Sequence, residues 1–251
     1  MRITDWHQRR VWIIGASSGI GAALAQLLGQ KGARLALTSR RSEALQALSI
    51  PNALCLPADA TDPQAMQGVH DQLLREWGSV DLIVYMAGDY EPTSVLQINP
   101  ERARRIIDVN FTAAMHLTHL VVPHLQPGQG VAWVASVAGY RGLPHALPYG
   151  PSKAALIHWA QCMRLELQPQ GIGVWLVNPG FVRTRLTAKN AFDMPFIITP
   201  QAAAQAMVKG WAKGQFEIHF PKRFSYFLKA LNLLPWSWYE KLITRWVKTP
   251  N

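Results

Sequence analysis

The sequence contains little cysteine, little acid and no long apolar run. Cys55 and Cys162 lie far apart and form no CxxC or CxxH pattern, which excludes a disulfide scaffold and favours a cytoplasmic protein. The chain has only 15 Asp and Glu but 25 Lys and Arg, which gives a net charge of +10. The longest stretch without these four residue types, Val109 to Tyr140, contains three histidines and two prolines, so it does not predict a membrane span.

The residues that are abundant form the pattern of a folded α/β protein. At 49% hydrophobic residues the chain is too apolar to be disordered. Short aliphatic runs alternate with amphipathic segments, which predicts a single-domain, Rossmann-like, doubly wound parallel sheet with helices on both faces. The predicted strands are Val11–Ile14, Arg34–Thr38, Ala53–Leu56, Asp81–Val84, Val131–Ala135 and Gly173–Val177, and the predicted helices are 19–30, 42–48, 63–77, 100–122 and 152–168.

The composition changes at the end of the chain. No linker interrupts residues 1–220, which we expect to form one dinucleotide-binding catalytic core. Residues 220–251 hold eight of the 24 aromatics, and six Lys and Arg against the single acid Glu240. We expect residues 221–251 to be a basic aromatic tail of two short helices hinged at Pro235, not an independent domain. Such helices are typical of peripheral contact with an anionic membrane; pocket capping and packing on a second subunit are the alternatives.

A glycine-rich turn follows the first predicted strand and leads into an Ala- and Leu-rich helix. The segment Gly15-Ala16-Ser17-Ser18-Gly19-Ile20-Gly21 has the spacing GxxxGxG. Glycines allow a diphosphate to approach the backbone closely, at the positive end of the helix. The turn could instead serve only helix packing, but the order of strand, turn and helix favours a dinucleotide site.

The residues after the second predicted strand bear on the choice of dinucleotide. An NAD site places an acid near this point, whereas an arginine accommodates the 2′-phosphate of NADP. The chain reads Ser39-Arg40-Arg41, with no acid until Glu43. Arginine side chains suit a phosphate dianion. This favours NADP(H) over NAD(H). The alternative is that Arg40 and Arg41 only belong to a solvent-exposed loop.

Tyr149 and Lys153 form the most informative pair. Positions four apart lie on one face of a helix, so the phenol and the ammonium should point into one site. A neighbouring ammonium stabilises a phenolate and lowers the pKa of a tyrosine, which makes Tyr149 a usable general acid or base. In isolation, YxxxK is common by chance.

The motifs occur together in one order. Over residues 10–220 this order and spacing resemble the short-chain dehydrogenase/reductase (SDR) family, and the tail resembles that of an uncharacterised bacterial-type subgroup. The residues that carry the resemblance are Gly15–Gly21, Asp59, Ala87-Gly88, Asn110, Ser136, Tyr149, Lys153 and Asn178-Pro179-Gly180.

The resemblance implies a catalytic set and a cofactor set. It implies that Tyr149 exchanges a proton with the substrate oxygen while hydride moves to or from nicotinamide, and that Ser136 hydrogen-bonds that oxygen. Lys153 would also hold the nicotinamide ribose, and Asn110 would support a water that links the lysine to solvent. The implied cofactor residues are Gly15, Ser17, Ser18, Gly19, Ile20, Gly21, Arg40, Arg41, Asp59, Ala60, Ala87, Gly88, Asn110, Tyr149, Lys153, Pro179, Gly180, Val182 and Thr184.

Two positions depart from the family pattern. Ile14 stands where Thr is usual, and Met86 stands where Asn is usual. Both usual residues tie cofactor-side turns to the sheet, so we expect the departures to affect loop geometry more than chemistry. Met86, Tyr140, His145 and Leu147 are candidate walls of the substrate pocket.

These observations predict an NADP(H)-dependent oxidoreductase that interconverts a carbonyl and a secondary alcohol. The segment Leu186–Pro200, which contains Phe192, Met194 and Phe196, is predicted to be an apolar substrate lid, so we expect an apolar substrate. The alternative is a catalytically weak NADP(H)-binding protein with a regulatory or membrane-associated role. The resemblance implies a homodimer or homotetramer formed through the helices that contain His116 and Lys153.

Two other classes of function are not supported. His116, His119 and His124 lack an acidic or Cys companion, so no metal site is predicted. Nucleic-acid binding would rest on net charge alone, because no binding motif accompanies it.

Overall fold

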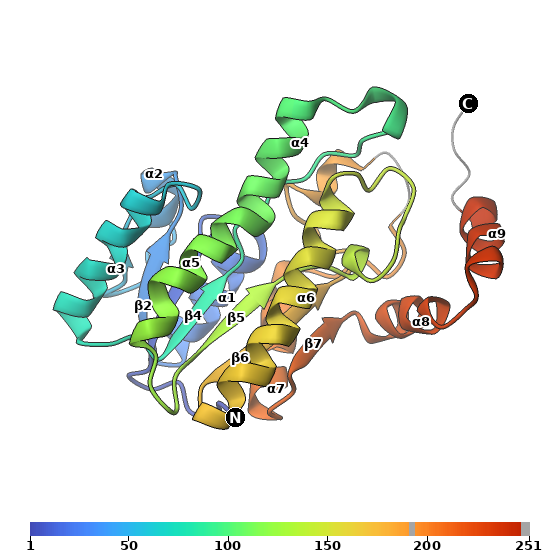
Figure 1. Ribbon diagram of the computed structural model, residues 1–251. Helices are drawn as coiled ribbons and strands as arrows, with labels where there is room; N and C mark the ends of the chain where they lie inside the picture. Colours follow the sequence, from blue (N-terminus) through green and yellow to red (C-terminus); the bar gives the residue numbers. More distant parts are fainter. Residues whose placement is uncertain (191–193, 247–251) are drawn as a thin grey trace.

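The protein is built on one seven-stranded parallel sheet. The computed structural model describes residues 1–190 and 194–246. The strands are arranged in the order β3-β2-β1-β4-β5-β6-β7 (Figure 1). The order reverses between β1 and β4, and ligands bind such sheets at the carboxyl ends of the strands beside this point. The strands are β1 (Arg10–Ile14), β2 (Arg34–Thr38), β3 (Leu54–Cys55), β4 (Leu82–Tyr85), β5 (Gly130–Val134), β6 (Gly173–Pro179) and β7 (Glu217–Phe220).

Helices cover both faces of the sheet, which confirms the predicted doubly wound α/β fold. Alternate residues of a strand point to opposite faces. In β1, Val11 and Ile13 therefore enter the core beneath α1 (Gly19–Gln30) and α7 (Pro200–Ala212). Trp12 and Ile14 enter the core beneath α3 (Pro63–Trp77), α5 (Ala113–Val121) and α6 (Tyr149–Leu167). Burial on both faces explains why the strands read as continuous apolar runs.

Several helices begin at a capping side chain followed by proline. The Asp62 carboxylate accepts hydrogen bonds from the backbone N–H of Gln64 and Ala65, and Pro63 follows as the first residue of α3. Asn99 caps α4 (Pro100–Ile107) in the same way. A proline at this position loses no helical hydrogen bond, and its φ angle suits the helix.

The observed elements differ from the predicted ones in three places. The predicted helix 100–122 is two helices, α4 and α5, joined by a π-helical turn at Asp108–Thr112. Helix α6 begins at Tyr149, three residues before the predicted start. Helix α7 and strand β7 were not predicted. The segment predicted as a lid therefore ends at the cap of α7, where Thr199 accepts a hydrogen bond from the backbone N–H of Ala202.

Two helices follow β7 at the edge of the sheet. They are α8 (Lys222–Asn232) and α9 (Trp236–Trp246), on either side of Pro235 (Figure 1). Phe224, Leu228 and Leu231 of α8 and Tyr239 and Ile243 of α9 form a small core around Val137. Within the described residues, no helix is both long enough and apolar enough to cross a bilayer.

Candidate active site

The glycine-rich turn lies at the switch point of the sheet, between the ends of β1 and β4. Gly15 has φ +94°, and a Cβ there would lie 2.6 Å from the backbone nitrogen of Ala87. A Cβ on Gly21 would lie 2.2 Å from the carbonyl oxygen of Gly15. Neither position accepts a side chain, because the chain crosses itself too closely. Ser17 and Ser18 precede α1, and Gly19 and Ile20 are its first two residues.

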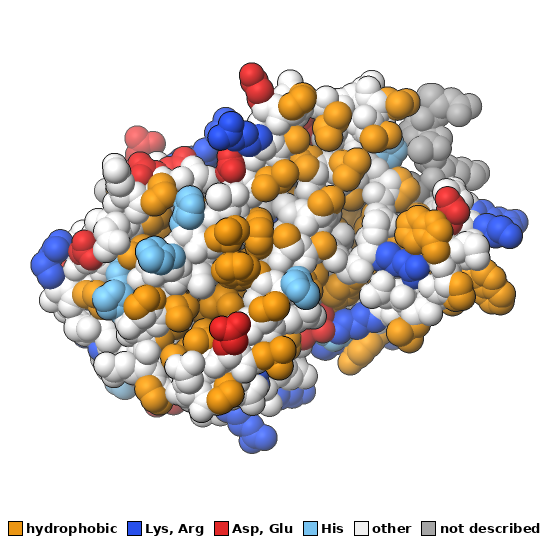
Figure 2. Space-filling model, viewed as in Figure 1, with side chains coloured by type: hydrophobic (Ala, Val, Ile, Leu, Met, Phe, Trp, Pro, Cys, Tyr) orange, Lys and Arg blue, Asp and Glu red, His pale blue; other side chains and the backbone are white. Residues whose placement is uncertain are grey.

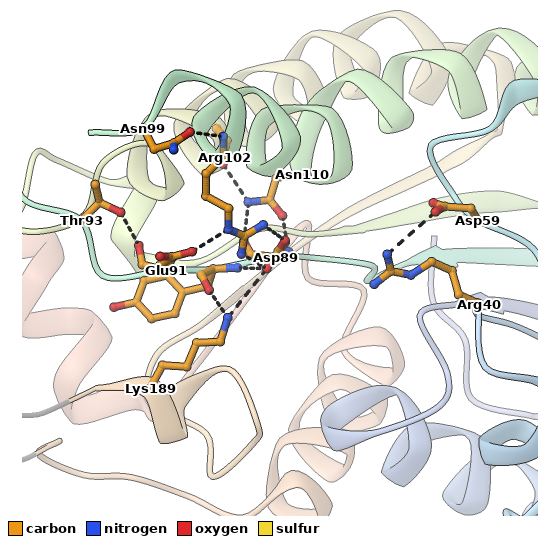
Figure 3. A network of polar contacts seen from close by, with 11 residues as sticks. Arg40, Asp59, Asp89, Glu91, Thr93, Asn99, Arg102, Asn110 and Lys189 are labelled. Carbon is orange, nitrogen blue, oxygen red and sulfur yellow. Dashed lines mark hydrogen bonds and ion pairs between the residues drawn. The ribbon is translucent and has the colours of Figure 1, made fainter. Parts of the chain in front are cut away.

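The two arginines after β2 lie close to this turn. The Arg41 guanidinium donates a hydrogen bond to the Ser17 hydroxyl at 3.1 Å. The Arg40 guanidinium lies 3.9 Å from the carboxylate of Asp59, which precedes Ala60 after β3 (Figure 3). Burial alone would raise the pKa of Asp59, but hydrogen bonds from Thr61 and the charge of Arg40 hold it below its ordinary value. The residues expected to hold the adenosine end therefore lie on one side of the turn.

The structure brings Ser136, Tyr149 and Lys153 together beyond the ends of β5 and β6. The Tyr149 hydroxyl is hydrogen-bonded to Ser136. The Lys153 ammonium lies 5.7 Å from the centre of the Tyr149 ring and donates to the carbonyl of Val134 at 3.0 Å. Ser136 also donates to the carbonyl of Pro179 at 3.3 Å. All three predicted side chains thus meet at one point.

Burial changes the protonation of this group in a way the sequence did not indicate. We expected Lys153 to lower the pKa of Tyr149. Instead, burial raises the pKa of Tyr149, and the hydrogen bond with Ser136 offsets it only in part. Burial also lowers the pKa of Lys153 to about 7. The loss of water disfavours both charged forms, the Lys153 ammonium and the Tyr149 phenolate.

Asn110 connects the site to the chain after β4. Its amide donates to the carbonyl of Asp89 and to the Ser152 hydroxyl, each at 3.0 Å, and its Oδ1 accepts from the Asp89 N–H at 2.9 Å. The residue lies in the π-helical turn, where the helix widens beside the site. A Cβ on Gly88 would lie 3.3 Å from Asn110 Oδ1 and 3.6 Å from Lys153 Nζ, so Gly88 packs directly against both buried groups.

The turn after β6 closes the site from the other side. Gly180 donates its backbone N–H to the Phe220 carbonyl at 2.7 Å. Val182 is buried and forms a bridge with Ile198, and the Thr184 methyl lies 3.0 Å from a Cβ built on Gly19. The residues expected around the nicotinamide and the diphosphate therefore adjoin the glycine-rich turn.

The two departures from the family pattern have packing roles. The sulfur of Met86 lies 2.9 Å from a Cβ built on Gly21, and the side chain joins the core beneath α1. Ile14 is buried in the opposite core. Met86 thus faces the glycine-rich turn, where its packing supports the turn in place of polar contacts.

Sequence reasoning missed several residues at the site. Asp89 and Tyr90 follow Ala87-Gly88 at the carboxyl end of β4. The Asp89 carboxylate accepts two hydrogen bonds from Arg102 and lies 3.9 Å from the Lys189 ammonium (Figure 3). The Tyr90 ring packs edge-on against Tyr149, with 4.9 Å between ring centres. Position at the end of a strand beside the switch point was the available signal.

The tail reaches the loop that carries Ser136. The Tyr140 hydroxyl donates to Glu217 at 2.5 Å, and the Lys229 ammonium of α8 lies at 2.5 Å from the other oxygen of the same carboxylate. The Arg141 guanidinium donates to the carbonyls of Leu231 and Leu234, each at 2.9 Å, which caps the end of α8. The inner face of the tail therefore packs on residues 137–143.

No group of His, Cys, Asp or Glu side chains within the described residues could hold a metal ion.

Comparison with known proteins identifies similar chains. Residues 9–194 match the family described as short chain dehydrogenase. An uncharacterized oxidoreductase of Myxococcus xanthus is 34% identical over 93% of this chain and 95% of its own length. An 11-beta-hydroxysteroid dehydrogenase-like protein of Arabidopsis thaliana is 30% identical over 90% of this chain and 77% of its own. A short chain dehydrogenase from Burkholderia cenocepacia, solved in complex with NADP, has a TM-score of 0.77 and 26% identity, and the match covers 86% of this chain and 96% of that one.

Proposed function

The chain belongs to the short-chain dehydrogenase/reductase family of oxidoreductases that act on CH–OH donors, and on that premise we propose that it interconverts an apolar carbonyl compound and a secondary alcohol with NADP(H). The observation that carries the proposal is the meeting of Ser136, Tyr149 and Lys153 beside the glycine-rich turn. The family assignment alone would not separate an active enzyme from a cofactor-binding relative. These three groups together can hold the substrate oxygen and move a proton to it or from it.

The residues present fit a dinucleotide. Gly15 and Gly21 let the turn pack directly on Ala87 and on itself, as a tight phosphate-binding turn requires. The N-terminus of α1, where a diphosphate would bind, carries no acid in its first turn. The bound cofactor would supply or accept the hydride. Tyr149 would give its proton to the substrate oxygen or take one from it, Ser136 would donate a hydrogen bond to that oxygen, and Asn110 and Lys153 would return the proton towards solvent.

A phosphate-binding role of Arg40 and Arg41 supports NADP(H). The Arg41 guanidinium contacts Ser17 of the glycine-rich turn, the Arg40 guanidinium lies beside Asp59, and the Burkholderia cenocepacia relative was solved with NADP. Arg41→Ala and Arg40→Ala should each raise the Kd for NADPH tenfold or more, consistent with loss of an ionic hydrogen bond of about 1.5 kcal/mol or more. NADH binding should change little. Arg104→Ala, on the exposed face of α4, is the control, and equal losses for both cofactors would contradict the role.

Turnover of a carbonyl panel tests the mechanism. NADPH oxidation would be followed with ketones, aldehydes and acyl thioesters of increasing apolar size. Tyr149→Phe should lower kcat at least a hundredfold, because positioned proton transfer contributes about 10²–10⁴-fold. Tyr226→Phe removes a hydroxyl from an exposed ring of α8 and should leave kcat unchanged. Unchanged turnover in Tyr149→Phe would overturn the mechanism, and failure of the whole panel would favour the catalytically weak alternative.

An apolar substrate is supported by the aromatic and aliphatic surroundings of the site. The Tyr90 ring lies against Tyr149, and Phe196, in the segment expected to act as a lid, is 55% exposed. Phe192 lies outside the described residues. The similarity to a relative described as 11-beta-hydroxysteroid dehydrogenase-like also supports an apolar ring compound as the substrate.

We also propose that the outer face of the tail contacts an anionic membrane. Leu233 is 87% exposed and Trp238 65% exposed, and Lys241 and Arg245 are exposed as well. Figure 2 shows Lys or Arg side chains among hydrophobic ones at the end of the molecule that α8 and α9 form. Each basic residue adds about 1 kcal/mol near an anionic surface. Flotation with phosphatidylglycerol vesicles should decline in Leu233→Ser and Trp238→Ser but not in Leu96→Ser, an equally exposed site elsewhere. Equal flotation of all three variants would contradict this contact. Substitution is preferable to deletion, because α8 also covers Val137.

A dimer or tetramer through α5 and α6 is the proposed assembly. Figure 2 shows apolar side chains gathered with histidines on the face that these helices form. Leu165 is 76% exposed there, and Met115, His116 and His119 are exposed on α5. Leu165→Glu should lower the mass measured by light scattering, while Leu96→Glu should not. An unchanged mass in Leu165→Glu would exclude this interface.

A further inference from the structure

The chain after β4 is braced against α4 by a group of charges. The Arg102 guanidinium donates two hydrogen bonds to Asp89 and one, at 2.5 Å, to Glu91 (Figure 3). Burial would raise the pKa of Asp89, but the hydrogen bonds and the charge of Arg102 hold it below its ordinary value. Asp89 therefore stays ionised, and its backbone exchanges hydrogen bonds with Asn110. Tyr90, the next residue, is thus held at a set position beside the catalytic residues.

Tyr90 contacts two segments that lie far apart in the sequence. Its ring packs against Tyr149 at an interplanar angle of 72°. Its hydroxyl donates to Asn190 Oδ1 at 2.6 Å, and its carbonyl accepts from the Lys189 ammonium at 2.6 Å. Burial, and then the proximity of Tyr149, raise the pKa of Tyr90 to about 12, so the hydroxyl remains a donor at neutral pH. One residue therefore links Tyr149 to the turn Thr187–Lys189 and to Asn190.

We propose that Tyr90 is a positioning residue that determines substrate specificity: its hydroxyl holds segment 187–190 over the substrate side of the site, and its ring forms the wall beside Tyr149. Because the Tyr90 hydroxyl already donates its hydrogen bond to Asn190, the Tyr90 side chain presents mainly carbon atoms to the substrate. Such a wall favours an apolar group next to the reacting carbonyl and disfavours a hydroxyl there, which would lose water without gaining a partner. The inference rests on the proposed function, since it concerns the specificity of that same site.

A double-mutant cycle between Tyr90 and Asn190 tests the link. Tyr90→Phe keeps the ring and removes the hydroxyl, and Asn190→Ala removes the acceptor. Each variant should raise KM for an apolar ketone about fivefold, the effect of one net hydrogen bond, with kcat within about twofold of wild type. If both act through their mutual bond, the double variant should also show about a fivefold rise. A rise near 25-fold, the product of the two, would overturn the link.

Specificity supplies a readout that simple destabilisation would not change. Tyr90→Phe should also reduce the preference in kcat/KM for an apolar ketone over its hydroxylated analogue. Once segment 187–190 is no longer held, water reaches the wall beside Tyr149 and solvates the hydroxyl of the analogue. Tyr226→Phe is the matched control. An unchanged preference, or an equal fall in kcat for both ketones, would overturn the role in specificity.

Limited proteolysis separates failure of this inference from failure of the proposed function. Trypsin cleaves after Lys189, whose ammonium bonds the Tyr90 carbonyl. Tyr90→Phe and Asn190→Ala should each be cleaved there several-fold faster than wild type and Tyr226→Phe, with no further increase in the double variant. This readout needs no turnover. Equal cleavage of all proteins would overturn the link even if Tyr149→Phe shows that Tyr149 is catalytic.

Discussion

Glu217 joins the tail to the loop that carries Ser136, and Glu217→Gln is the sharpest test of that connection. The carboxylate accepts from Tyr140 at 2.5 Å, from the Asn178 amide at 2.8 Å and from Lys229 at 2.5 Å. Burial would raise its pKa, but Lys229, Tyr140 and Asn178 hold the pKa below the ordinary value of 4.5. One carboxylate thus connects α8, the loop after β5 and the strand β6.

The cost of the substitution follows from these contacts. Glutamine keeps the shape and one acceptor oxygen, but it loses the charge-assisted bond to Lys229. Such bonds contribute about 1.5–3 kcal/mol. The Lys229 side chain is 35% exposed, so water replaces part of the loss and the lower end, about 1.5 kcal/mol, applies. For a chain of this size that corresponds to a fall in Tm of about 3–6 °C.

Denaturant and thermal unfolding at neutral pH would measure the change. Glu166→Gln, at an exposed position of α6, is the matched control and should change the free energy of unfolding by less than about 0.5 kcal/mol. Lys229→Met removes the other charge and keeps most of the stem over the Tyr140 ring. The losses in Glu217→Gln and Lys229→Met should not add in the double variant. Additive losses, or a Glu217→Gln protein as stable as the control, would refute the reasoning.

The pH dependence has a definite sign. A carboxylate whose folded pKa is depressed contributes stability above its unfolded pKa and loses it as pH falls through the folded value. The difference between wild type and Glu217→Gln should therefore be greatest at neutral pH and should shrink below pH 4.5, the ordinary carboxyl value. A difference that grows on acidification would contradict the assignment.

Three further changes test the site and its scaffold. Burial lowers the pKa of Lys153 from 10.5 to about 7, so between these pH values the folded protein binds fewer protons than the unfolded chain, and its stability should rise with pH. The free energy of unfolding, measured at pH 7 and pH 9.5, should rise less in Lys153→Met than in wild type. An equal rise in both proteins would contradict the burial of Lys153. Gly15→Ala should cost about 1–3 kcal/mol and weaken NADPH binding at least tenfold, because its Cβ would lie 2.6 Å from the Ala87 nitrogen; a stable variant with wild-type Kd would refute this. Gly68→Ala, exposed in α3 with nothing within 4 Å of the new Cβ, should add about 0.5–1 kcal/mol in urea unfolding, and any loss would count against it.

Much of the core was predictable because its signals are local. The strand before Gly15, the turn and the helix after it follow one another directly along the chain. Asp62-Pro63 and Asn99-Pro100 mark helix starts because each capping side chain bonds a backbone N–H no more than three residues away. The same cap and proline occur at Thr199-Pro200, but the apolar residues before them favoured a lid, so α7 was missed. β7 has four residues, too few for a clear pattern.

The contacts that set the properties of the site join distant positions. Tyr90 and Asn190 are 100 residues apart, and Tyr140 and Glu217 are 77 apart. No short window contains both partners of such a pair, and neither residue alone indicates the other. The direction of the pKa shift at Tyr149 was wrong for a related reason, because spacing places Lys153 nearby but says nothing about how much water the surrounding helices exclude.

The sequence by itself determined the alternation of strands and helices and the residue types at the ends of the strands, since both depend on local backbone preference and on the order of burial along the chain. Only the tertiary structure decided that Asp89, Tyr90 and Glu217 belong beside the site, that Met86 supports the glycine-rich turn, and that the inner face of the tail packs on the loop after Ser136. These follow from packing between segments that meet only when the sheet forms, and their energies depend on the burial that packing creates.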